Sequence, residues 1–173
     1  MANIFTALGL TLKHEGGYAF DPADPGGETY CGISRKDFPN WPGWVLVDQK
    51  KPLSYNQIIQ DTGLIAKVNA FYLVLWRACG GDLINSQRIA SALFDWYVTS
   101  GRRAIYALQK IVGVKMDGEM GPETIDAVNN GQEGNIFLKF VSFRIDFYRA
   151  LAVNNPSMSK FLGGWVARAE SYT

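Results

Sequence analysis

Four carboxylate side chains fall within a short stretch near the start of the chain, at Glu15, Asp21, Asp24 and Glu28. Glycine and proline residues between them favour tight turns, which keep acids that are close in sequence close in space. Breaking a glycosidic bond needs one carboxyl group that is still protonated near neutral pH and a second group that acts on the other face of the sugar. The cluster contains candidates for both groups.

Glu15 is the better candidate for the protonated acid. It is expected in the last turn of a helix, where the partial negative charge of the helix end disfavours a carboxylate. Neighbouring acids, and packing against Tyr18 or Phe20, would disfavour the ionised form further. Asp24, in a polar loop, is expected to stay ionised. The spacing alone also fits loop aspartates that bond to their own backbone and an ordinary exposed Glu15.

Other chemistries fit the sequence less well. His14 is the only histidine, and Tyr18 stands where a zinc protease of the H-E-x-x-H type needs its second histidine. A cysteine hydrolase would have to pair Cys31 with His14, but Cys31 is expected in a strand, so a buried structural cysteine is the preferred interpretation. The chain has too few Cys and His residues for a structural zinc site, and it has no phosphate-binding glycine loop. No metal or cofactor is expected.

A helix and an irregular loop position the acidic cluster. Apolar residues at positions 4, 8 and 12 predict a helix over residues 3–15, which Gly16 and Gly17 end. Prolines at 22 and 25 exclude a helix over 18–33, and residues 28–33 are expected to form a short strand or hairpin arm. Residues 34–53 contain three prolines and are expected to be mainly loop.

The rest of the chain is predicted to be helical. Ser54 and Gln57 resemble a capping box, so a helix is expected from there, broken near Gly63, to the glycines at 80 and 81. Further helices are expected from residue 85 or 86 to 100, over 102–112, from Pro122, over 134–153 and over 157–171. The natural seam is expected around residues 85–100. A lobe of residues 1–93 and a helical lobe of residues 94–173 would share one core there.

Composition limits the class of protein. Hydrophobic residues make up 47% of the chain, which is ample for a core, and a net charge of +1 gives no electrostatic sign of a nucleic-acid partner. Cys31 and Cys79 are expected to be free thiols. No apolar run is long enough to span a membrane, and the first residues lack the features of a secretory signal. We therefore expect synthesis in the cytoplasm without a signal peptide and no membrane insertion.

Residues 14–33, with the sequence HEGGYAFDPADPGGETYCGI, resemble glycoside hydrolase family 108. Members of that family show an E-G-G-Y motif and then a D-P-x-D-P-G-G-x-T-x-x-G-I loop. The resemblance implies a peptidoglycan muramidase of the phage, prophage and bacterial type, with Glu15 as its catalytic acid. It also implies a mainly α, lysozyme-like fold of two lobes with a small β element after the first helix.

The second half of the chain extends the resemblance. The stretches at 94–101 and 107–109, and DGEMGPETIDAV at 117–128, look like the predicted peptidoglycan-binding segment that follows the catalytic half in this family. The family commonly has Asn where this chain has Thr99, so any glycan contact of that Asn would be altered here. The stretch DGEMGPET is also explained as a turn followed by the start of a helix.

A looser similarity to phage-type lysozymes implies roles for two further residues. Those enzymes place an Asp and a Thr at short spacings after a helix-end Glu, although the gap from Asp24 to Thr29 is one residue shorter here. Asp24 would orient water or stabilise the oxocarbenium-like charge, and Thr29 would help to position the water. Asp21 is the rival of Asp24 for the second catalytic role.

Together these observations predict hydrolysis of the β-1,4 bond between N-acetylmuramic acid and N-acetylglucosamine in the glycan strand of peptidoglycan. Substrate contacts are expected from Tyr18, Asp21, Tyr30, Tyr97 and Thr99. Three alternatives stay open, namely a lytic transglycosylase, a peptidoglycan-binding module without catalysis, and an amidase that depends on the thiol of the chain's first cysteine. We expect a monomer of the endolysin type that acts on the periplasmic cell wall and crosses the membrane through a holin-type pore.

Overall fold

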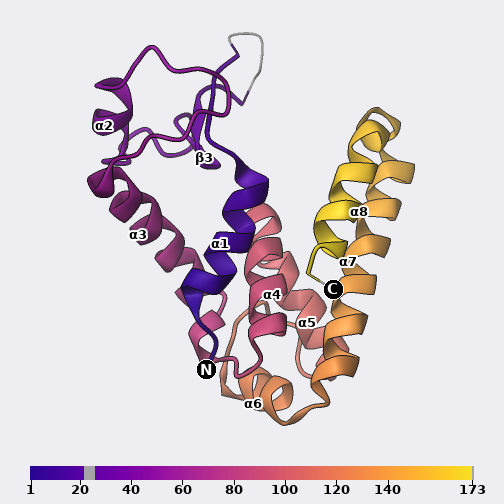
Figure 1. Cartoon of the computed structure of the whole chain (residues 1–173). Helices are drawn as coiled ribbons and strands as arrows, with labels where there is room; N and C mark the ends of the chain where they lie inside the picture. The colour runs from indigo at the N-terminus through magenta and orange to yellow at the C-terminus, as the bar shows by residue number, and fades with distance from the viewer. Residues whose placement is uncertain (22–25, 173) are drawn as a thin grey trace. The chain divides into compact units, whose positions relative to one another are not determined.

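The computed structural model in Figure 1 describes residues 1–21 and 26–172. The protein is mainly helical, with one small antiparallel sheet directly after the first helix, which confirms the predicted fold class. Contacts divide the chain into two compact units, which we name unit 1 (Met1–Ala7 and Leu75–Thr173) and unit 2 (Leu8–Val74). Within the described ranges, no helix combines the length and the hydropathy that a membrane crossing requires.

The division between the two units falls within two helices, and the seam that the sequence suggested at residues 85–100 stays a prediction. The divisions fall at residues 7 and 8, in α1 (Ile4–Glu15), and at residues 74 and 75, in α3 (Thr62–Ala78). The proposed division of functions at residues 93 and 94 stays a prediction, because contacts between helices do not report which residues bind or react.

Unit 2 contains the segment that carries the acidic cluster. After α1 come three two-residue strands, β1 (Tyr18–Ala19), β2 (Thr29–Tyr30) and β3 (Ile33–Ser34), in the spatial order β1-β2-β3. Both pairings are antiparallel, and Tyr30 lies opposite Tyr18 on one side and Ile33 on the other. The strand or hairpin arm predicted within residues 28–33 is therefore the middle of this small sheet.

Two expectations for unit 2 need correction. The segment 34–53 is not all loop, because it contains the short helix α2 (Trp44–Asp48), which buries Trp44 and Val47. The next helix does not start at Ser54. The Gln57 side chain does accept a hydrogen bond from the Ser54 backbone N–H at 2.9 Å, as in a capping box, but the chain only turns there.

The helix α3 begins eight residues later, at Thr62, where the Asp61 carboxylate accepts a hydrogen bond from the Leu64 N–H at 2.9 Å. The preceding segment pairs with β1 instead of forming a helix. Tyr18 donates its N–H to the Gln57 carbonyl at 3.0 Å and accepts one from Asn56 at 2.7 Å. These backbone hydrogen bonds outweigh the local preference for a helix.

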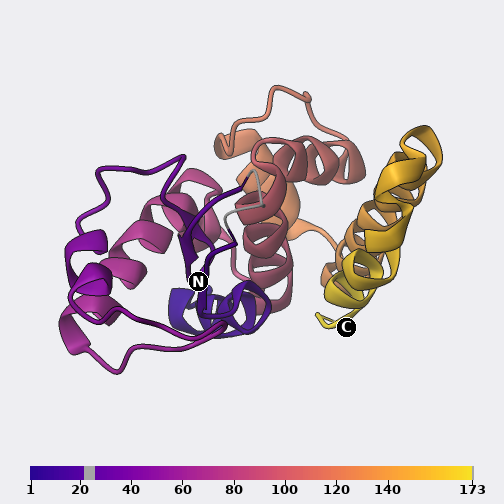
Figure 2. The same ribbon diagram turned by 90° about the horizontal axis from the view of Figure 1, so that it is seen from above.

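Unit 1 contains most of the helices. They are η1 (Gly81–Leu83), α4 (Gln87–Ser100), α5 (Arg103–Val112), α6 (Pro122–Asn130), α7 (Glu133–Asn154), η2 (Pro156–Phe161) and α8 (Leu162–Glu170). Ser86 caps α4 by accepting a hydrogen bond from the Ile89 N–H, and Pro122 opens α6, both as predicted. The helix expected over 157–171 is instead a 3-10 turn followed by α8, which lies beside α7 (Figure 2).

The core of unit 1 is built around Trp96 of α4. Its ring is fully buried and meets the rings of Phe140, Phe143, Phe147 and Tyr148 from α7 at centroid distances of 5.3 to 6.4 Å. The tilted and edge-on ring geometries are those that aromatic side chains prefer in protein cores. This contact joins α4 to α7, the longest helix among the described residues.

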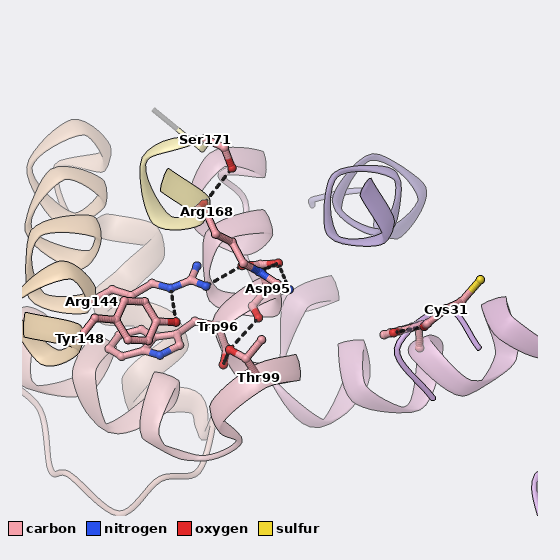
Figure 3. A network of polar contacts seen from close by, with 9 residues as sticks. Cys31, Asp95, Trp96, Thr99, Arg144, Tyr148, Arg168 and Ser171 are labelled. Carbon is pink, nitrogen blue, oxygen red and sulfur yellow. Dashed lines mark hydrogen bonds and ion pairs between the residues drawn. The ribbon is translucent and has the colours of Figure 1, made fainter. Parts of the chain in front are cut away.

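Asp95, next to Trp96, is a fully buried acid that ties three helices together (Figure 3). Its carboxylate forms ion pairs with Arg144 of α7 and Arg168 of α8, each at 2.7 Å. Burial alone would raise the pKa of Asp95, but the hydrogen bonds and charges of Arg168 and Arg144 outweigh burial and lower it. The three helices therefore depend on an ionised Asp95.

We predict that Asp95→Ala lowers the free energy of unfolding by about 3–5 kcal/mol, because the buried Arg144 loses its counter-charge. Since the pKa of folded Asp95 lies below its ordinary value of 3.8, its contribution is complete above that pH and is lost as the pH falls through the folded pKa. Urea unfolding at several pH values checks both statements. The exposed Asp126→Ala is the control, and an equal loss in both variants would contradict the prediction.

Candidate active site

Glu15 is the last residue of α1, and two glycines tied to a distant segment set the direction of the chain after it. Gly16 has a φ of +71°, and a Cβ atom at this position would lie 2.7 Å from Oδ1 of Asn56. Gly17 donates its N–H to the same Oδ1 at 2.7 Å, and a Cβ there would meet the carbonyl oxygens of Asn56 and Gln57 at 2.5–2.6 Å. No side chain fits at either position, so the E-G-G sequence fixes where the helix ends.

The carboxyl group of Glu15 occupies a space that exists because residue 32 is glycine. A Cβ atom built on Gly32 would lie 2.5 Å from Oε2 of Glu15 and 2.8 Å from the hydroxyl oxygen of Tyr72. The buried Tyr72, from α3, donates this hydroxyl to the carbonyl oxygen of Cys31 at 2.7 Å. The carboxyl group of the half-buried Glu15 and the hydroxyl group of Tyr72 thus lie where any residue other than glycine at position 32 would place its side chain.

Glu28, the fourth acid of the cluster, is engaged in an ion-pair network. Its carboxylate lies 2.5 Å from Nε of Arg35 and 2.7 Å from Nζ of Lys51, and Asp48 bonds to the same two cations. Hydrogen bonds from Lys51 and then Arg35 lower the pKa of Asp48. Because Glu28 and Asp48 form ion pairs with the same two cations, we assign Glu28 to the support of the hairpin rather than to acid catalysis.

The other candidates of unit 2 lie around the sheet. Asp21 is exposed just after β1, Thr29 is half-buried in β2, and Asp24 lies outside the described residues. Tyr30 is buried, and its hydroxyl accepts a hydrogen bond from the Ile59 N–H at 3.1 Å. Burial raises the pKa of Tyr30 to about 12. A role of Tyr30 in sugar contact stays a prediction, while its packing role is clear.

A hollow of about 510 Å³ opens beside β1 and is lined by Tyr18, Phe20, Glu28, Lys51, Pro52 and Leu53. The Tyr18 ring forms part of its buried wall, and burial followed by a hydrogen bond with Glu28 raises the pKa of the Tyr18 phenol. Phe20 is 56% exposed, so its ring offers an open aromatic face. The expected packing of Glu15 against Tyr18 or Phe20 stays a prediction.

Two candidates belong to unit 1. Both lie on α4, where Tyr97 is half-buried and Thr99 is exposed. The Thr99 hydroxyl donates to the Trp96 carbonyl at 3.1 Å, a hydrogen bond to the preceding turn of its own helix. The side chain that stands where the family commonly has Asn is therefore engaged with the backbone, and its predicted contact with substrate stays a prediction.

The stretch 117–124 is organised by the buried Gln109 of α5. Its amide nitrogen donates to Oδ1 of Asp117 at 2.8 Å and to the carbonyl of Glu119 at 2.9 Å, while its amide oxygen accepts the Gly118 N–H at 2.9 Å. Gly118 has a φ of +75°, and a Cβ there would meet the Tyr106 ring at 2.7 Å. The turn interpretation accounts for the glycine, and Gln109 explains how the turn is held.

Both cysteines are free and buried, as predicted. Cys31 is not in a strand, however, but between β2 and β3 with a φ of +49°. Burial raises the pKa of Cys31 to about 11 and that of Cys79 to about 12. A nucleophilic cysteine needs the opposite shift, so the structure opposes an amidase that uses Cys31. Over residues 1–21 and 26–172, no group of His, Cys, Asp and Glu side chains is arranged to hold a metal ion.

Sequence reasoning missed the residues that hold Glu15. Gly32 stands in the quoted loop motif, but its role needs the distance to Glu15, and Tyr72 and Asn56 lie about forty residues or more further along the chain. In the sequence, a glycine directly before a buried isoleucine in a short hairpin is only a weak sign that another group lies close to the backbone there. The partners themselves are visible only in three dimensions.

Comparisons with known proteins match both parts of the chain to family models. The family model described as Glycosyl hydrolase 108 matches residues 8–101, more than half of the chain, and the model described as Predicted Peptidoglycan domain matches residues 103–170. A solved structure of SagA from Brucella abortus is similar, with a TM-score of 0.70 and 26% identity over 97% of this chain and 90% of that one. No functionally curated protein matches the chain.

We predict that native Cys31 and Cys79 react with a thiol reagent at pH 8 on the order of a hundredfold more slowly than they do in the unfolded chain. The raised pKa values leave little thiolate, and burial limits access. A thiol-disulfide exchange assay with and without denaturant measures the two rates. Fast modification of one thiol in the native protein would contradict this assignment and would reopen the question of a nucleophilic cysteine.

Proposed function

The chain belongs to the glycosyl hydrolase 108 family, and we propose that it acts as a muramidase whose general acid is Glu15. The family assignment and the peptidoglycan domain model together make it a glycosidase directed at peptidoglycan. The proposal adds the bond that is cleaved, the β-1,4 link between N-acetylmuramic acid and N-acetylglucosamine, and the residues that cleave it.

The observation that carries the proposal is the position of Glu15 beside Gly32. Three glycines make room for one carboxyl group, because side chains at 16 and 17 would meet the segment at 56–57 and a side chain at 32 would meet Glu15 itself. Glu15 is a half-buried acid at the end of a helix, and its carboxyl group lies near the hydroxyl group of Tyr72. Glu28, by contrast, is neutralised by two cations.

In the proposed reaction the Glu15 carboxyl group gives its proton to the glycosidic oxygen as the bond from that oxygen to C1 of N-acetylmuramic acid breaks. Positive charge develops on C1 and the ring oxygen. Water adds to C1 and loses a proton to a second carboxylate, for which Asp24 and Asp21 remain the two candidates. Thr29 would help to place the water. The sum is hydrolysis, which leaves a reducing N-acetylmuramic acid end.

The sugar rings next to the cleaved bond need apolar platforms. The hollow beside β1, with the exposed ring of Phe20 and the buried wall of Tyr18, is the candidate we propose because Glu28 of the acidic cluster also lines it. Tyr30, Tyr97 and Thr99 stay candidate contacts for the rest of the glycan strand. We further propose that the enzyme works on the periplasmic cell wall after release from the cytoplasm through a holin-type pore.

We predict that Glu15→Gln slows the release of soluble fragments from purified peptidoglycan sacculi by about 10² or more, the usual size of an acid catalyst's contribution. Gln keeps the shape of the side chain but cannot donate the proton. Sedimentation with sacculi should be unchanged. Glu123→Gln, an equal change of charge on the exposed side of α6, is the control. Equal rates for both variants would remove Glu15 from the mechanism, and binding without release by the wild type would favour a non-catalytic module.

We predict that Gly32→Ala lowers the release rate by at least about tenfold, because the new methyl group displaces the Glu15 carboxyl group, and a misplaced catalytic group costs this much or more. Alanine at a φ of +76° also costs about 1–2 kcal/mol of stability. Gly113→Ala is a matched control, since its φ is +77° and its Cβ would meet no described atom within 4 Å. Unfolding and release are measured on both variants, and parallel losses of stability with equal release would contradict the account.

A further inference from the structure

A row of cations and aromatic rings lies on the face of unit 1 formed by α5 and α7. Arg103 of α5 stands over the ring of Phe147 at 4.9 Å, and Lys110, two turns further along α5, stands over the ring of Phe143 at 5.3 Å. Both rings rest on the buried Trp96, at 5.8 and 6.4 Å. The rings are therefore held in place by the core, and the cations lie above them.

A hollow of about 370 Å³ continues this row. Lys110, Ile111, Lys139, Ser142, Phe143 and Asp146 line it. Its volume lies in the range of small-ligand sites, and its lining combines an apolar floor with two ammonium groups and a hydroxyl group. We name this hollow and the Arg103 and Lys110 cations beside it the α5–α7 face.

The α5–α7 face is positively charged. The sequence of α5 contains no acidic residue. The one acid in the lining, Asp146, is bonded to Arg149 at 3.2 Å, so its charge is offset on its own helix. Among residues 1–21 and 26–172, no carboxylate lies within ion-pair distance of Lys110 or Lys139. The two ammonium groups are thus available to an anion that enters the hollow.

Peptidoglycan has one part that matches this chemistry. Its amino sugars carry no charge once they are linked to peptide, whereas the peptide stems carry free carboxylates and apolar methyl groups. Two ammonium groups beside a fixed aromatic ring suit a carboxylate followed by a small apolar side chain. The family model described as Predicted Peptidoglycan domain also spans both α5 and α7.

The geometry points to the α5–α7 face as a binding site for the carboxylate-bearing peptide stems of peptidoglycan, with Lys110 and Lys139 as the anion contacts. This inference rests on the proposed function, because it names the part of the same substrate that the second domain holds. Glu15 would then act on the glycan while unit 1 binds the peptides. A glycan strand without peptides would bind more weakly.

The test measures binding of the full-length chain in the Glu15→Gln background, so that the sacculi are not digested during the experiment. The probes are intact sacculi, a synthetic stem tetrapeptide, the same peptide with its carboxylates amidated, and peptide-free glycan strands. We expect Lys110→Gln/Lys139→Gln to bind sacculi and the free-acid peptide about tenfold more weakly at low salt, and less difference at high salt, where charges are screened. The amidated peptide should bind wild type and variant equally weakly.

Lys160→Gln is the matched control, because Lys160 also stands over an aromatic ring, that of Phe161 at 4.9 Å, but on η2 and away from the hollow's lining. It should bind like the parent. If the double variant binds the free-acid peptide as tightly as the parent, or if the amidated peptide binds as well as the acid, the inference is wrong. The inference is also wrong if the parent binds inorganic polyphosphate more tightly than it binds the free-acid peptide. The Lys110→Gln/Lys139→Gln variant is also made with Glu15 intact. Its release of fragments from peptide-free strands should equal that of the wild type. This measurement tests the proposed function alone.

Discussion

The space beside Gly32 is the constraint on which the rest of unit 2 depends. It must be empty of a side chain so that Oε2 of Glu15 and the hydroxyl of Tyr72 can both approach it. The glycines at 16 and 17 allow α1 to end close to the segment at 56–57. They thereby set the position of Glu15, the last residue of the helix. The small sheet and α3 then act as the walls that keep this arrangement in place.

Charge compensation marks two of the acids as supports of the fold. Asp95 in unit 1 is surrounded by Arg144 and Arg168, and Glu28 in unit 2 by Arg35 and Lys51. The two arginines lower the pKa of Asp95, so its carboxyl group is ionised at neutral pH and cannot serve there as a proton donor. The Glu15 carboxyl group lies beside Gly32, near the hydroxyl group of Tyr72.

Local patterns were sufficient where one residue type decides the structure. The glycines that follow Glu15 end α1, Ser86 caps the start of α4, and Pro122 opens α6. The sequence predicts these three helix ends. They were insufficient where a distant segment competes. The capping-box pattern at Ser54 gives way to pairing with β1, and α2 is too short for its periodicity to be recognised. Asp95 and Arg168 are 73 residues apart, so their pairing leaves no local trace. Of the site, Glu15 was predictable from its motif, whereas Tyr72 and the role of Gly32 required the fold.

The most direct test of the central claim is the chemistry of the new ends that the wild-type enzyme makes. Purified sacculi would be digested in H₂¹⁸O and the soluble fragments examined by mass spectrometry before and after borohydride reduction. The account predicts reducing N-acetylmuramic acid ends that carry ¹⁸O at C1, as water addition at that carbon requires. Anhydro-muramic ends without ¹⁸O would contradict it and would identify a lytic transglycosylase, and reducing N-acetylglucosamine ends would show that the other glycosidic bond of the strand is cleaved.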